Sequence, residues 1–191
     1  FGYATLNTMY SIVLDEEKFN YFFILAILNS KLIKAFFLSK YSDGKSLFPK
    51  VKGFQLKELP IIIANQTQQL PLINHSKTIL DLNLNFHSIS NLFTNYLQSQ
   101  FAIERLSKKL QNWHELEYGD FIKELNKAIK KTGGEKLTKM DEMEWMDVFE
   151  IKKAETLTLK AEIDKTDALI NKMVYELYGL SEAEIVIVEK S

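Results

Sequence analysis

The sequence contains no cysteine, which excludes disulfide bonds and thiolate metal sites. We therefore expect a reducing, cytoplasmic compartment. Glycine is scarce, with 7 in 191 residues, and no glycine-rich phosphate-binding loop is present. Gly133-Gly134 follows a pair of lysines and is typical of a helix end. The chain begins with Phe1 and shows no signal-peptide pattern, so we expect a piece of a longer polypeptide.

The sequence also contains little arginine and carries a small net charge. Arg105 is the single arginine among 24 basic residues, and the net charge is −1. The charge is uneven, because residues 1–60 carry eight lysines against five acids and residues 111–191 carry twelve lysines against eighteen acids. Seven lysines and one acid, Asp43, lie within residues 31–57. This surplus indicates either a phosphate-facing patch or a solvated basic face.

A long uninterrupted apolar run is missing as well. The most apolar stretch, residues 19–38, is interrupted by Asn20, Asn29, Ser30, Lys31 and Lys34. A membrane span needs about 20 mostly apolar residues, so we interpret the stretch as a buried core helix. We expect this helix to run from about residue 16 to residue 39 after an N-cap at Asp15. Asn29-Ser30 is expected to cap or bend it.

The N-terminal region is predicted to contain both strands and a helix. Residues 3–14 are rich in aromatic and β-branched side chains, which favour strands. Residues 48–52 and 54–56 alternate and indicate two further short strands. We therefore expect an α+β fold, with a small mixed α/β N-terminal portion followed by a long antiparallel helical and coiled-coil bundle. The chain as a whole is expected to be predominantly helical.

From about Gln69 the pattern becomes helical. Apolar residues recur at three- and four-residue steps at Leu70, Ile73, Ile79 or Leu80, Leu84, Ile89, Leu92, Tyr96 and Leu97. Further helical segments contain Leu106, Leu110 and Trp113, and then Phe121, Leu125 and Ile129.

The last long helix is predicted over about residues 139–178. Its seam has a 4-3-4-3-4-3 spacing through Leu159, Ile163, Thr166, Ile170, Met173, Leu177 and Leu180. An upstream helix in antiparallel contact is the simplest partner, and a homodimer through residues 159–180 stays open. Gly179 is expected in the left-handed region as a helix stop, and Ser181 with Glu184 forms a capping box for a short final helix.

The sequence contains only weak matches to motifs of catalytic or metal-binding sites. The three histidines have no carboxylate or second histidine at a metal-binding spacing, and no nucleophile elbow surrounds any serine. Asp147 with Glu150-Ile151-Lys152 matches the spelling of a metal-dependent nuclease motif. On a continuous helix these charges are more typical of a solvated face. We therefore expect no catalytic residue, no metal and no cofactor in this chain.

Several blocks, taken in order, resemble a known family. They are Tyr3–Thr8, Leu25–Leu32, Phe48–Lys52, Gln55–Ile61, Gln68 or Gln69 before Leu70, and Met173–Ile185. In this order they resemble the C-terminal specificity (target recognition, TaqI-like) region of type IIG-like restriction–modification enzymes and adenine-specific DNA methyltransferases. Residues 80–112 carry no block of the resemblance.

The resemblance implies two regions with separate roles. Residues 1–66 would be the C-terminal part of a target recognition domain, and residues 67–191 a helical spacer. The chain would bind double-stranded DNA, without a membrane, and position the methyltransferase or nuclease domains of the same polypeptide. The parent chain would be a DNA (adenine-N6) methyltransferase that binds S-adenosylmethionine in another domain, and whether it also cleaves stays open.

The basic surplus at residues 31–57 gives the candidate DNA contacts. These candidates are Lys40, Tyr41, Ser42, Lys45, Ser46, Lys50 and Lys52. The competing hypothesis is a helical scaffold or oligomerisation module that makes no DNA contact.

Overall fold

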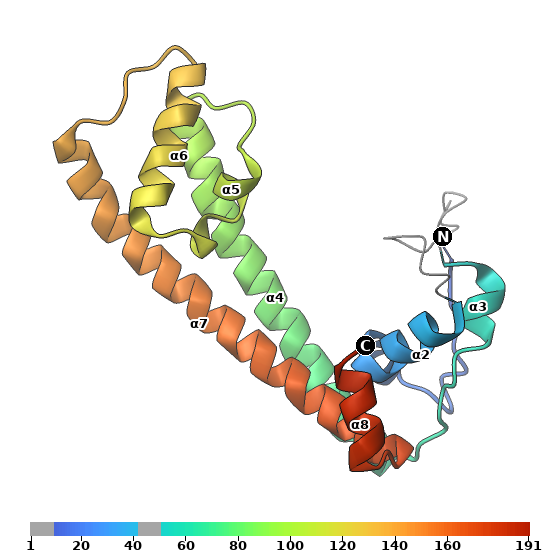
Figure 1. The fold of residues 1–191 in the computed structure, drawn as a ribbon. Coiled ribbons are helices and arrows are strands. Elements are labelled where there is room, and N and C mark those ends of the chain that lie inside the picture. Colours follow the sequence, from blue (N-terminus) through green and yellow to red (C-terminus); the bar gives the residue numbers. More distant parts are fainter. Residues whose placement is uncertain (1–9, 42–50) are drawn as a thin grey trace. The chain divides into compact units, whose positions relative to one another are not determined.

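The computed structural model describes residues 10–41 and 51–191, and its described elements are helices (Figure 1). They are α1 (Tyr21–Asn29), α2 (Lys31–Tyr41), α3 (Gly53–Lys57), α4 (Gln66–Gln100), α5 (Lys108–Gln111), a 3₁₀ turn (Trp113–Glu115), α6 (Tyr118–Lys131), α7 (Lys139–Tyr178) and α8 (Glu182–Glu189). The expectation of a predominantly helical chain is confirmed.

The expected mixed α/β portion is wrong. Residues 10–14 and 51–52 form no strand, and residues 54–56 lie in α3. A strand needs a partner for its backbone hydrogen bonds, and the described residues provide no second strand. Instead, the Gln55 side chain accepts a hydrogen bond from the Lys52 backbone N–H at 2.7 Å, which favours a helix start. The expected strands at residues 3–9 and 48–50 lie outside the described residues.

The helix expected over residues 16–39 is two helices. Asn20, rather than Asp15, is the N-cap of α1, since its side chain accepts from the Phe22 N–H at 2.8 Å. Ser30 separates α1 from α2, and the two axes differ by 57°. The Ser30 hydroxyl donates to the Ile27 carbonyl at 2.7 Å and accepts from the Ile33 N–H at 3.3 Å. The expected capping and bending role of Asn29-Ser30 is confirmed.

In the described ranges, no single helix has the length and apolar character of a membrane span. The bent pair α1 and α2 meets the length and composition criteria only when the two helices are taken together. Within the fold, the α1 side chains of Phe23, Ala26 and Ile27 are buried in a core.

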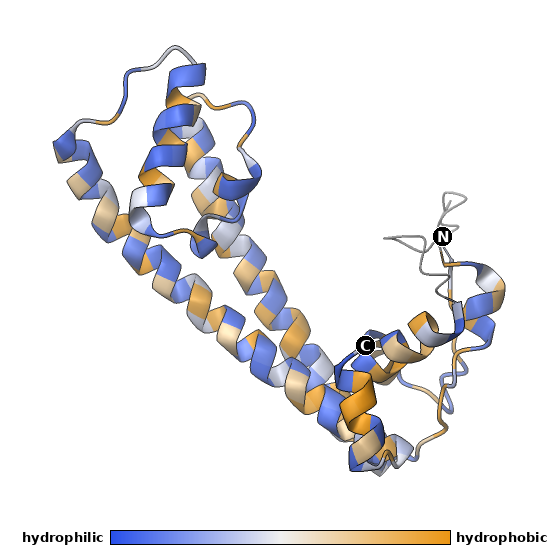
Figure 2. Ribbon diagram, viewed as in Figure 1, coloured by the Kyte–Doolittle hydropathy of each residue, from blue (hydrophilic) through white to orange (hydrophobic). Residues whose placement is uncertain are grey.

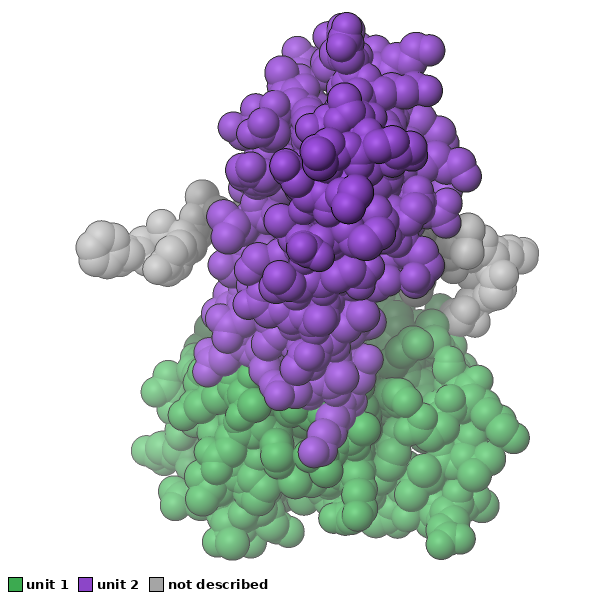
Figure 3. Space-filling view, turned by 90° about the vertical axis from the view of Figure 1, so that its left-hand side faces the viewer, with its two compact units in different colours: residues 1–79, 166–191 green, residues 80–165 purple. Residues whose placement is uncertain are grey.

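The chain divides into two compact units, drawn in different colours in Figure 3. Unit 1 comprises residues 1–79 and 166–191, and unit 2 comprises residues 80–165. The long helices α4 and α7 contribute residues to both units. The sequence analysis divided the chain differently, into residues 1–66 and residues 67–191 with separate roles. That division stays a prediction.

The core of unit 1 joins distant parts of the sequence. Phe23 and Ile27 of α1 cluster with Leu72 of α4 and with Ile170 and Val174 of α7, and all five are buried. Helix α8 contacts α2 in the same unit (Figure 1). The N-terminal helices therefore share one apolar core with the C-terminal end of the chain.

The core of unit 2 is built from aromatic rings. Phe121 stacks on Phe149 with 4.6 Å between ring centroids, and Phe93 lies 4.0 Å from Trp113. Trp145 packs beside this cluster, 6.3 Å from Phe93. Because these rings come from α4, α6, α7 and the 3₁₀ turn, they hold the four segments together.

The inward face of α4 differs from the face that the apolar pattern suggests. Figure 2 shows apolar and polar residues alternating along this helix. Leu70, Leu84 and Leu92 are each more than half exposed. The covered positions follow a 3-4 spacing through Gln69, Leu72, Ser76, Ile79, Asn83, Phe86, Ser90, Phe93 and Leu97. Four of the first eight covered residues are polar, and they alternate with apolar ones. A search for apolar residues alone therefore does not detect this face of the helix.

The predicted bounds of the last long helix, the helix stop at Gly179 and the capping box at Ser181 are confirmed. Helix α7 spans Lys139–Tyr178, and every seam residue from Leu159 to Leu180 is at least partly covered. Gly179 has φ +67°, and the Leu180 N–H donates to the Tyr175 carbonyl at 3.0 Å, as in a Schellman motif. Ser181 caps α8 together with Glu184. Gly133, with φ +82°, ends α6 in the same way.

Candidate functional site

Three of the seven predicted DNA contacts lie in the described residues. Lys40 and Tyr41 form the end of α2, and Lys52 directly precedes α3. The other four, Ser42, Lys45, Ser46 and Lys50, lie outside the described residues. Lys40 and Tyr41 therefore directly precede residues 42–50 in the sequence, and Lys52 follows them closely.

Glu58 joins Lys40 to Tyr41. The Lys40 ammonium lies 2.7 Å from a Glu58 carboxylate oxygen, and the Tyr41 hydroxyl donates to the same oxygen at 2.6 Å. The Tyr41 ring also meets the Phe54 ring edge-on, with centroids 6.3 Å apart. These contacts connect the end of α2 to α3 and to the residue that follows it. Glu58 stands one residue beyond the basic stretch 31–57, so a count of charges within that stretch does not include it.

The pKa shifts in this group follow from the ion pair. The Lys40 ammonium lowers the pKa of Glu58, and the Tyr41 hydroxyl lowers it further. Glu58 in turn raises the pKa of Lys40 through the same hydrogen bond. Desolvation raises the pKa of Tyr41, and so does its bond to Glu58. At neutral pH the group therefore holds a carboxylate, an ammonium and a neutral phenol, and the charge of Lys40 is largely compensated.

Other lysines of this region have no carboxylate partner among the described residues. Lys34, Lys52 and Lys57 are exposed, and none forms an ion pair with another described residue. Lys34 and Lys57 were not among the predicted contacts. Exposed lysines are available to phosphate oxygens where no described carboxylate competes for them.

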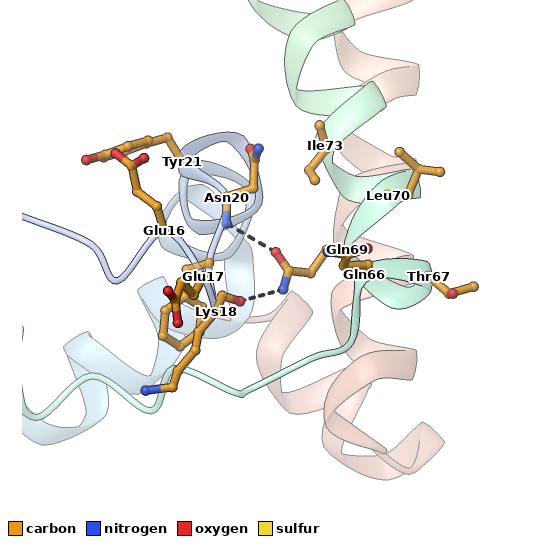
Figure 4. A pocket seen from close by; sticks show the side chains of 11 residues that line it. Glu16, Glu17, Lys18, Asn20, Tyr21, Gln66, Thr67, Gln69, Leu70 and Ile73 are labelled. Carbon is orange, nitrogen blue, oxygen red and sulfur yellow. Dashed lines mark hydrogen bonds between the residues drawn. The ribbon is translucent and has the colours of Figure 1, made fainter.

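Gln69 holds the segment before α1 against the start of α4 (Figure 4). Its side-chain amide donates to the carbonyls of Lys18 and Ala64, each at 2.8 Å, and its carbonyl accepts from the Asn20 N–H at 3.2 Å. Gln69 is 5% exposed, so these bonds satisfy a buried amide. A hollow of about 670 Å³ opens beside it, lined partly by Glu16.

Gln68 has a separate role at the same turn. Its side chain accepts from the Asn65 N–H, and the Asn65 side chain accepts from the Gln68 N–H, both at 3.0 Å. This reciprocal pair caps the N-terminus of α4. Of the two glutamines singled out in the sequence, Gln68 starts the helix and Gln69 joins it to the preceding chain.

The end of α7 holds the closing part of the N-terminal region. The Tyr178 hydroxyl donates to the Pro60 carbonyl at 2.6 Å and accepts from the Ile62 N–H at 3.3 Å. Burial raises the pKa of Tyr178, so its phenol stays protonated. Tyr178 therefore contributes directly to positioning residues 60–62.

A second contact reaches the start of α2. The Asn171 side chain accepts from the Lys31 N–H at 2.7 Å, so a residue 140 positions away caps this helix. Glu189 lies 2.5 Å from the Lys31 ammonium and accepts from the Tyr175 hydroxyl at 2.7 Å. The pKa of Glu189 is lowered, mainly by Lys31. Together α7 and α8 fix the α1–α2 junction.

We predict that Gln69→Ala lowers the stability of unit 1 by about 1–3 kcal/mol, because it leaves a part-buried N–H and two carbonyls without their partner. Gln66→Ala, at an exposed position on the same turn, is the matched control and should change stability by less than about 0.5 kcal/mol. Urea unfolding followed by far-ultraviolet circular dichroism measures both. Equal stabilities of the two variants would contradict the bridging role of Gln69.

The formal nuclease motif has no metal-site geometry. Within residues 10–41 and 51–191, no group of three or more histidine or acidic side chains is placed to hold a metal ion. Asp147 and Glu150 are exposed on α7, and Lys152 pairs with Glu155 at 2.8 Å. His114 is buried, and burial lowers its pKa, so this side chain is neutral.

Two family models match the chain. Residues 1–61 match the TaqI-like C-terminal specificity domain, which confirms the resemblance for that part. Residues 65–174 match a domain of unknown function (DUF8810). No curated protein and no solved structure matches the chain. Since the second model covers more than half of the 191 residues, the chain belongs to the DUF8810 family and carries a TaqI-like specificity region before that domain.

Proposed function

We propose that the chain is a DNA target-recognition and spacer module of a bacterial restriction–modification enzyme. The carrying observation is the match of residues 1–61 to a TaqI-like specificity domain. Lys34, Lys52 and Lys57 support this proposal, since they are exposed and form no ion pair with a described residue, and such cations suit phosphate contact. Lys45, Lys50, Ser42 and Ser46 stay in the proposal as candidate contacts.

The helices that follow position this region within the proposed enzyme. Tyr178 and Asn171 bond to residues 60–62 and to Lys31, so the end of α7 fixes the region that carries the specificity match. Through these contacts, the position of the helical spacer would determine the position of the recognition surface. The chain itself is not catalytic in this proposal. Its parent would be an adenine-specific DNA methyltransferase in the cytoplasm, using S-adenosylmethionine in another domain.

The scaffold alternative has less support. Its dimer seam at residues 159–180 includes Ile170 and Met173, which pack against the core that contains Leu72 and Phe23 of the same chain. A dimer through this part of the seam would have to displace these contacts.

The proposal predicts salt-dependent binding to duplex DNA. The triple variant Lys34→Gln, Lys52→Gln and Lys57→Gln should reduce the slope of log affinity against log salt by about 0.9 for each lost phosphate contact. Fluorescence anisotropy with a labelled duplex measures that slope. The matched control removes three lysines of α7, by Lys152→Gln, Lys160→Gln and Lys165→Gln, and should leave the slope unchanged. Equal slopes for both triple variants would contradict the assigned surface.

A further inference from the structure

Unit 2 contains a basic hollow that the specificity match does not cover. It has a volume of about 1140 Å³ and lies between residues 102–108 and α6. Its lining cations are Arg105, Lys108, Lys127, Lys130 and Lys131, and its lining acids are Glu104 and Glu124. Unit 2 as a whole contains fifteen acidic and thirteen basic residues. The net positive charge around the hollow therefore differs from the slightly negative charge of the unit.

Most of these cations are not compensated inside the unit. Lys127 pairs with Glu124 at 2.7 Å, and this bond lowers the pKa of Glu124. Arg105, Lys108 and the pair Lys130-Lys131 form no ion pair with any residue that the structure describes. Four exposed cations therefore line one hollow, and none of them is paired with a described carboxylate.

Helix electrostatics explain only some of them. Lys130 and Lys131 end α6, where cations interact favourably with the helix dipole. Lys108 is the first residue of α5, and the dipole of this four-residue helix is too small to explain its placement. Arg105 lies outside any helix. The helix dipole therefore explains the placement of Lys130 and Lys131 but not that of Arg105.

The segment that presents Arg105 is fixed by hydrogen bonds. The Gln98 side chain donates to the carbonyls of Ile103 and Glu104 at 3.2 and 3.1 Å, and the Gln111 side chain donates to the Leu106 carbonyl at 3.1 Å. Ile103 and Leu106 are both buried in the unit 2 core. Because both sides of Arg105 are anchored, binding there would cost little ordering of the backbone.

The positive surface continues along α6. A neighbouring hollow of about 640 Å³ shares Lys127 and Lys130 with the first one. It adds Lys123, Lys136 and Lys139, of which Lys136 forms no ion pair within the described residues. We call Arg105, Lys108, Lys127, Lys130, Lys131 and Lys136 the basic band. Its extent over two hollows suits a chain of phosphates rather than a single anion.

We infer that the basic band binds the sugar–phosphate backbone of duplex DNA. This inference rests on the proposed function, and it gives the DUF8810 domain a direct part in DNA binding. Lysine contacts to phosphates position a protein on DNA and carry no sequence information. The band therefore adds affinity and salt dependence, while target choice remains with the specificity region.

The test uses the full 191-residue chain and a labelled 30-base-pair duplex. The triple variant Arg105→Gln, Lys108→Gln and Lys131→Gln should lower the salt slope of binding by about 0.9 per lost contact. It should leave the affinity ratio between preferred and random duplexes unchanged. The Lys152→Gln, Lys160→Gln and Lys165→Gln variant removes the same charge from α7 and is the control. Circular dichroism checks that all variants remain folded.

The outcomes separate this inference from the proposed function. If wild-type chain does not bind duplex DNA even at low salt, both fail. If the Lys34/Lys52/Lys57 variant binds more weakly while the band variant matches the α7 control, only the inference about the band fails. If polyglutamate or anionic vesicles compete as well as duplex DNA at equal charge, the assignment of duplex DNA to the band is wrong. A lower slope with an unchanged affinity ratio supports it.

Discussion

Phe149→Ala should destabilise unit 2 by about 3–5 kcal/mol, the usual cost of removing a buried aromatic ring. Phe149 is fully buried, and its ring lies 4.6 Å from Phe121, 5.5 Å from Tyr118 and 5.9 Å from Trp113. Three rings from two segments, α6 and the 3₁₀ turn, line the space that the variant would leave. They are also packed against other groups, so the space cannot close completely.

Tryptophan fluorescence during urea unfolding measures this change directly. Both tryptophans, Trp113 and Trp145, lie in unit 2, so their emission reports on this unit. Val148→Ala is the matched control, because the neighbouring Val148 is 45% exposed and should cost less than about 1 kcal/mol. Similar midpoints for the two variants would show that the aromatic cluster does not organise unit 2.

Val174→Asp should unfold unit 1, at a cost of several kcal/mol for an unpaired buried carboxylate. Val174 is fully buried and belongs to the cluster that contains Phe23, Ile27 and Leu72. The variant should abolish protection of the α1 amides against hydrogen exchange. Ala168→Asp places the same carboxylate at an exposed position of α7 and should leave that protection intact.

Sedimentation of the Val174→Asp variant also addresses the scaffold alternative. Loss of α1 protection in a chain that is monomeric before and after the change agrees with packing inside one copy. A dimeric wild type that becomes a folded monomer would mean that the 159–180 seam joins two copies. In that case α7 would serve a coiled-coil dimer rather than the core of its own chain.

Local signals predicted the ends of α6 and α7 and the start of α8, although the N-cap expected at Asp15 was wrong. Gly179, Ser181 and Glu184 identify the end of α7 and the start of α8 from backbone freedom and capping alone. The lysines and glycines at residues 130–134 predicted the end of α6 for the same reason. Such signals need only residues within one helical turn, so a sequence displays them without knowledge of the fold.

Features that depend on distant partners could not be predicted. The Lys31 N–H is capped by Asn171, and Gln69 bonds to Lys18, about fifty residues before it. The strand prediction failed at residues 54–56 because alternation alone does not supply a neighbouring strand. The contact residues predicted from a lysine count included Lys40, whose charge Glu58 compensates. Sequence separation hides such pairs until the fold is known.

Selection of bound duplexes from a random-sequence pool tests the central claim most directly. If residues 1–61 belong to a DNA target-recognition module, as their family match suggests, the full chain should enrich one short motif over the starting pool. The band variant at Arg105, Lys108 and Lys131 should enrich the same motif at lower salt. Retention of duplexes without enrichment of any motif would contradict target recognition by this chain.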